Sequence, residues 1–181
     1  MSFAHRVLYK TSNTCSWVTC ILLFALFSLI VANRHAYGQY LDVPAHDPSR
    51  ILYEDFEDGR NGTVRRYHVF YTGNGILTRM STDLLNWSAP QSMFTSPPSW
   101  VSTHVPNKTD MIYWAPDVVY HNGLYHMYYS VSTFGAQTSA IALATSPTLN
   151  PSAPGYGWTD RGPVITSKAG SPYNTIDPAI F

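Results

Sequence analysis

Three aspartates in this chain lie beside prolines, and their spacing suggests a shared chemical role. Asp47 and Asp177 each precede a proline and Asp117 follows one, at intervals of 70 and 60 residues. Each opens a stretch of strand-forming composition. A carboxylate repeated at the head of successive β-units predicts a β-propeller whose inner strands direct acids toward a central funnel. Paired carboxylates in such a funnel hydrolyse glycosides, whereas an isolated Asp-Pro pair is more simply a turn or a strand cap.

The segments that must position these acids have strand patterns, and none keeps a helical apolar period over three turns. Gly73-Asn74-Gly75 and His121-Asn122-Gly123 are turn signals between apolar runs. The two predicted β-units, which contain Asp47 and Asp117, each end at a tryptophan, Trp87 or Trp158. The charged segment 54–66 is predicted to be a solvated loop. The predicted strands are residues 67–71, 76–81, 117–120, 124–131 and 140–144. The fold class is therefore all-β.

The N-terminal segment differs from the rest of the chain. Residues 1–16 carry basic residues and no acid, residues 17–31 are almost unbroken apolar sequence, and small residues follow at 36–38. This order predicts a secretory signal peptide over residues 1–38, with a signal anchor as the alternative. The domain would then be residues 39–181, secreted, extracellular and free of the membrane once the signal is removed. Three Asn-X-Ser/Thr acceptor sequons agree with a secreted glycoprotein.

Composition excludes several classes of function. Formal net charge is zero and charged residues make up 12% of the chain, so no basic surface for nucleic acid is expected. Both cysteines lie inside the predicted signal peptide, at Cys15 and Cys20, which leaves the remaining domain without a disulfide. No histidine pair has the spacing of a zinc site, so no metal ligand is assigned.

Five strings occur in order along the chain: HDPS at 46–49, WAPD at 114–117, YYSVSTFG at 128–135, TSAIALATSP at 138–147 and YNTIDPA at 173–179. In order and spacing they resemble strings of glycoside hydrolase family 43 arabinanases. This resemblance covers about residues 41–181 and implies the N-terminal part of a five-bladed β-propeller, here truncated to its first two to three blades. It also implies inverting cleavage of α-1,5-linked arabinan, a plant cell-wall polysaccharide, by a protein that is monomeric when full length.

The resemblance also implies roles for individual residues. Asp47 matches the general base that activates the attacking water, and Asp177 matches a carboxylate that orients the catalytic acid and raises its pKa. Asp117 remains open as a structural or a funnel-lining residue. Trp100 is a possible stacking residue, with core packing as the favoured alternative. The candidate substrate-binding residues are Trp114, Phe134, Gly135 and Asn174.

The general acid of the family is a glutamate well after the Asp177 motif, and this sequence has only Glu54 and Glu57. The chain as given is therefore expected to be inactive. No cofactor is required by the sequence, although a calcium or other ion near the propeller axis is possible in full-length relatives. Two other functions remain open: a non-catalytic sugar-binding propeller or pseudoenzyme, and an arabinofuranosidase or xylosidase of the same family.

Overall fold

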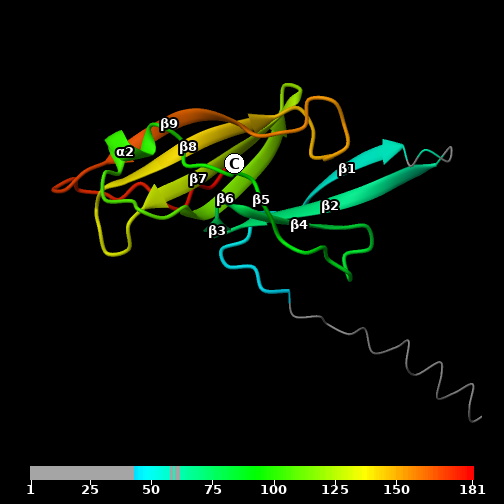
Figure 1. Cartoon of the computed structure of the whole chain (residues 1–181), viewed down its shortest axis with the longest axis horizontal. Helices are drawn as coiled ribbons and strands as arrows, with labels where there is room; N and C mark the ends of the chain where they lie inside the picture. The colour runs from blue at the N-terminus through cyan, green and yellow to red at the C-terminus, as the bar shows by residue number, and fades with distance from the viewer. Residues whose placement is uncertain (1–42, 58, 60–61) are drawn as a thin grey trace, which may run out of the picture. The chain divides into compact units, whose positions relative to one another are not determined.

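The computed structural model describes residues 43–57, 59 and 62–181, which belong to one compact unit spanning Leu41–Phe181. The predicted signal peptide, residues 1–38, lies outside the described residues. The unit contains two antiparallel sheets and one short helix, α2 (Val101–His104), as Figure 1 shows. Apart from the two-residue strand β3 (Gly73–Asn74), which pairs out of chain order, strands that follow one another in the chain are neighbours in each sheet, which is the construction of a propeller blade. The predicted all-β class is confirmed.

The first sheet has the order β1-β2-β4-β5. Its strands are β1 (Leu52–Glu57), β2 (Thr63–Tyr71), β4 (Leu77–Ser81) and β5 (Gln91–Ser92). The prediction of a loop over residues 54–66 was wrong, because most of this segment forms the β1–β2 hairpin. Partly buried and exposed residues alternate along β1, and on the exposed face Arg65 of β2 pairs across to Asp55 of β1 at 2.7 Å. Charged residues on the solvent face of a hairpin thus resemble a loop in composition.

The second sheet has the order β3-β6-β7-β8-β9. Its strands are β3 (Gly73–Asn74), β6 (Ile112–His121), β7 (Leu124–Ser132), β8 (Ser139–Ser146) and β9 (Thr159–Ser167). Asn122 and Gly123 both have positive φ, 48° and 80°, as the predicted Asn-Gly hairpin requires.

The predicted turn at residues 73–75 has a second role. Gly73 and Asn74 form β3, which pairs with β6 and so attaches the segment between β2 and β4 of the first sheet to the second sheet. Gly75 has φ 70°, and a Cβ there would lie 2.2 Å from the carbonyl oxygen of Phe94. Only glycine fits this turn without moving backbone.

The core holds aromatic residues of both sheets. Phe70 on β2 meets the Trp158 ring edge-to-face at 5.5 Å, and Phe94 lies 5.2 Å from the fully buried Tyr129 of β7. Trp100 packs against this core and its Nε1 donates to Asp160 at 3.0 Å. Trp158, which ends the second predicted β-unit, thus also packs against the first sheet.

His68, on β2, makes the stability of this unit depend on pH. The side chain is 2% exposed and stacks on Phe70, and burial lowers its pKa from 6.5 to about 4. The neutral ring is thus the folded form. Its contribution to stability is complete above pH 6.5 and is lost as the pH falls toward 4.

We expect wild type to lose about 3 kcal/mol more unfolding free energy than His68→Phe between pH 7 and pH 4. Urea unfolding of both proteins at the two pH values measures this difference, and the carboxylates common to both cancel. Equal losses would contradict a buried neutral histidine.

Candidate active site

The segments around Asp47, Trp114 and Asp177, one from the start of each predicted β-unit, line a cleft of about 530 Å³. Asp47 and Asp177 line it, together with Trp114 and Phe134. A neighbouring pocket of about 380 Å³ shares Trp114 and Phe134 and adds Gly135 and Asn174; one of about 300 Å³ shares both aspartates. The structure therefore brings both aspartates and the four candidate substrate-binding residues to one connected surface, whereas Trp100 packs against the core and does not line these pockets.

The two cleft aspartates share an unusual backbone conformation. Asp47 and Asp177 have φ of 47° and 56°, and Ala115, which also precedes a proline, has φ of 42°. Non-glycine residues rarely adopt positive φ, and such strain concentrates at functional sites. Ala115, and not Asp117, is therefore the residue of the second unit that repeats the position of Asp47 and Asp177.

The expectation that each aspartate opens a strand needs the same correction. Asp117 lies within β6, whereas Asp47 and Asp177 lie in segments without strand structure. A positive φ followed by proline, which has no N–H, does not fit a regular ladder. In β6 the interruption is a register shift between Trp114 and Asp117, and such bulges redirect side chains beside active sites.

Asp47 is held by two polar neighbours. Thr72 Oγ1 donates to its Oδ2 at 2.9 Å, and His46 Nδ1 lies 2.8 Å from the same oxygen. Thr72 Oγ1 also accepts the backbone N–H of Ala115 at 2.9 Å, so one hydroxyl links the heads of both units. The Asp47 side chain remains 44% exposed, which leaves it accessible to water in the cleft.

Asp177 is positioned through its backbone. Its N–H donates to Ser130 Oγ of β7 at 2.8 Å, and the buried Thr175 donates its N–H to Ser139 Oγ of β8 at 2.9 Å. Ser139 Oγ also donates to Asn174 Oδ1. The Asn174 carbonyl is therefore occupied within the protein, and its amide N–H groups are the part left for a ligand.

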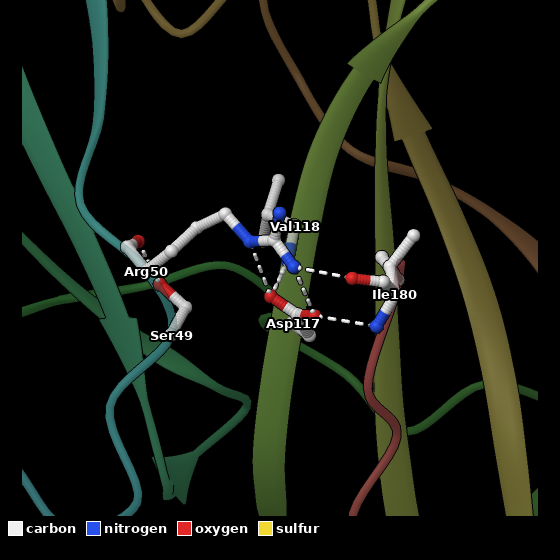
Figure 2. A network of polar contacts seen from close by, with 5 residues as sticks. All are labelled: Ser49, Arg50, Asp117, Val118 and Ile180. Atoms are coloured by element: carbon white, nitrogen blue, oxygen red, sulfur yellow. Dashed lines mark hydrogen bonds and ion pairs between the residues drawn. The ribbon is translucent and has the colours of Figure 1, made fainter.

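Asp117 belongs to a network that ties together the heads of three segments (Figure 2). Arg50 donates Nε to Asp117 Oδ1 at 3.0 Å and Nη2 to Oδ2 at 2.9 Å. Arg50 Nη2 also reaches the Ile180 carbonyl at 2.7 Å, and the Ile180 N–H returns to Asp117 Oδ2 at 2.8 Å. Asp117 lines the pocket of about 300 Å³, but it is buried and both its oxygens accept hydrogen bonds from within the protein.

The aromatic candidates differ in exposure. Phe134 is 95% exposed beside the cleft, whereas Trp114 is half-buried. Gly135 has φ 76° and open space where a Cβ would stand, so the turn conformation, and not packing, accounts for the glycine. Phe134 is thus free to stack on a ligand, and Trp114 forms part of the wall.

Sequence reasoning missed Lys108 and Asp110, which also line the cleft. Lys108 Nζ lies 2.7 Å from Asp110 Oδ1 and 5.3 Å from the centre of the Trp114 ring. The only available signal was their position just before the WAPD string, in the segment that leads into β6, the strand that carries Trp114.

Neither glutamate lines the cleft. Glu54 accepts from Thr148 Oγ1 at 2.8 Å and from the Leu149 N–H at 2.8 Å, linking β1 to the loop after β8. Glu57 lies exposed on the β1–β2 hairpin. Residues 43–57, 59 and 62–181 contain no group of three or more His, Cys, Asp or Glu that could hold a metal ion.

The sequence profile of glycosyl hydrolases family 43 matches residues 52–181. The chain belongs to this family. The match includes Trp114, Phe134 and Asp177, while Asp47 lies five residues before its start. Membership agrees with the resemblance found in the motifs.

Two curated relatives are much longer than this chain. An extracellular exo-α-(1→5)-L-arabinofuranosidase of Cellvibrio japonicus is 44% identical over 92% of this chain and 43% of its own length. An extracellular endo-α-(1→5)-L-arabinanase of Bacillus subtilis is 46% identical, over 75% of this chain and 38% of its own. The chain therefore spans about two fifths of these relatives.

Solved arabinanase structures agree with the fold. The arabinanase of Cellvibrio cellulosa in complex with arabinohexaose has a TM-score of 0.65 and 38% identity, covering 77% of this chain and 41% of that one. A native arabinanase of Bacillus subtilis has a TM-score of 0.62 and 39% identity, covering 76% of this chain and 43% of that one.

In the described part of the chain, no helix has the length and apolarity to cross a bilayer.

Proposed function

We propose that this chain carries the arabinan-binding cleft and two of the three catalytic carboxylates of a secreted, inverting arabinanase. The observation that carries the proposal is the placement of Asp47 and Asp177 on one cleft with Trp114 and Phe134. Furanose rings have apolar faces that stack on aromatic side chains, and carboxylates supply the acid–base chemistry. Relatives named as extracellular arabinan-degrading enzymes support the substrate and the secretion.

In this proposal Asp47 is the general base. Its carboxylate would accept a proton from the water that attacks the anomeric carbon, while Thr72 and His46 hold its orientation. An inverting enzyme keeps its base and acid roughly 6.5–9.5 Å apart so that this water fits between them. Asp177 would orient the acid and raise the pKa of that acid through like-charge proximity.

The general acid would come from outside the described residues, because neither glutamate lines the cleft: Glu54 accepts a hydrogen bond from Thr148, and Glu57 lies exposed on the β1–β2 hairpin. The polypeptide as given is therefore proposed to bind arabinan without cleaving it at an appreciable rate. Exo-acting cleavage is the second candidate, because one relative is named an exo-arabinofuranosidase. Product lengths released by an acid-containing form would separate exo from endo action.

The test is calorimetric titration with arabinohexaose. We expect wild type to bind and Trp114→Ala to bind at least about tenfold more weakly, because stacking on an aromatic ring contributes on the order of 1 kcal/mol or more. Trp87→Ala is the matched control, since Trp87 does not line the cleft. No binding by wild type, or equal losses in both variants, would refute the proposed site.

A further inference from the structure

Lys108 has an unusual environment for a lysine at the wall of a cleft. Its side chain is only 3% exposed, whereas that of its ion-pair partner Asp110 is 56% exposed. Its ammonium also lies within cation–π distance of the Trp114 ring. A buried ammonium needs a partner to offset its desolvation, so Asp110 is held in place by Lys108.

Asp110 presents its two oxygens differently. Oδ1 accepts both Lys108 Nζ at 2.7 Å and the backbone N–H of Ile112 at 2.8 Å. Both contacts use Oδ1; Oδ2 takes part in none of the hydrogen bonds or ion pairs found among the described residues, and Asp110 lines the cleft. The hydrogen bond from Lys108 lowers the pKa of the Asp110 carboxyl, so the group stays ionised. One fixed anionic acceptor thus faces the cleft beside an aromatic wall.

This combination suits a neutral sugar. A hydroxyl that donates to a carboxylate makes a charge-assisted hydrogen bond, while the C–H face of the same ring packs on an indole. An anionic sugar would be repelled, because Asp47, Asp110 and Asp177 share the cleft and the one lining lysine is already paired. The arrangement therefore discriminates by charge as well as by shape.

We propose that Asp110 Oδ2 is a binding group for an arabinofuranosyl hydroxyl, locked in place by Lys108, and that it selects uncharged arabinan over uronic-acid chains. This inference rests on the proposed function of the cleft. Asp110 is a specificity-determining residue in it and takes no part in proton transfer. The Lys108–Asp110–Trp114 contact keeps the acceptor and the aromatic wall in a fixed relation.

The experiment titrates wild type, Asp110→Ala and Asp55→Ala with arabinohexaose and with a galacturonate oligosaccharide of similar length. Asp55 is the matched control, because it also pairs with a basic residue, Arg65, but lies on the exposed hairpin. We expect Asp110→Ala to lower the affinity for arabinohexaose about tenfold and to reduce the ratio of arabinohexaose to galacturonate affinity. Asp55→Ala should bind both sugars as wild type does. Near-ultraviolet circular dichroism of the free proteins checks that the Trp114 environment is retained.

A purely structural role for Asp110 predicts a changed tryptophan spectrum with an unchanged preference between the two sugars, and that result would overturn the inference. Equal arabinohexaose affinity of wild type and Asp110→Ala would also overturn it, while the proposed function would stand. Failure of wild type to bind arabinohexaose would overturn the proposed function and this inference with it. Lys108→Met supplies a second variant: it keeps the length of the stem, and we expect it to reproduce part of the Asp110→Ala loss.

Discussion

An Asp47→Asn variant is expected to lose about 10²–10⁴-fold in the hydrolysis of a dinitrophenyl α-L-arabinofuranoside. Dinitrophenolate leaves without being protonated, so this substrate does not need the general acid and reports on the base alone. Asparagine keeps an oxygen for the hydrogen bond from Thr72, so the side chain should hold its place while losing its basicity. The initial rate of dinitrophenolate release measures the effect.

The same assay contains its own controls. Asp55→Asn removes a carboxylate from the exposed β1–β2 hairpin and should leave the rate unchanged. Linear arabinan has a leaving group that does need a proton, so wild type, Asp47→Asn and Asp55→Asn should all fail to cleave it at a detectable rate. If Asp47→Asn turns over the activated substrate as fast as wild type does, Asp47 is not the base.

Asp117→Ala is expected to destabilise the protein by about 3 kcal/mol. The substitution leaves the Arg50 guanidinium, which is half-exposed, and the Ile180 and Val118 N–H groups without their acceptor. Water can reach Arg50, which reduces the penalty, but the two backbone donors are less accessible. Urea unfolding followed by circular dichroism measures the change.

Asp55→Ala is again the matched control, because Arg65 binds Asp55 with the same two-pronged geometry, at 2.7 and 2.8 Å, on the surface. Exposed ion pairs contribute little, so this variant should unfold close to wild type. Equal losses of unfolding free energy in Asp117→Ala and Asp55→Ala would mean that the network of Figure 2 stabilises the protein no more than an exposed ion pair does.

The sequence predicted the fold class well because strand and turn signals are local. The Asn122-Gly123 hairpin follows directly from residues that tolerate positive φ. The β1–β2 hairpin was missed because its exposed face is charged and its partner strand is defined only by pairing, as between Asp55 and Arg65. Composition alone does not separate a solvated loop from the outer face of a hairpin.

The candidate site shows the same limit. Motif order pointed to Asp47 and Asp177, and the structure places both on one cleft; their catalytic roles stay predictions. Asp117 was misplaced in the repeat because a proline neighbour is visible in sequence and a backbone angle is not. Lys108 and Asp110 were missed because a buried ion pair beside a tryptophan depends on tertiary contacts.

The most direct test is to follow the backbone amide NMR signals of the protein during titration with arabinohexaose. The account predicts that the largest shifts fall on the segments lining the cleft, around Asp47, Lys108–Trp114, Phe134 and Asp177, with the β1–β2 hairpin unchanged. Shifts confined to surfaces away from the cleft, or none at saturating sugar, would contradict the assignment of this cleft as the arabinan site.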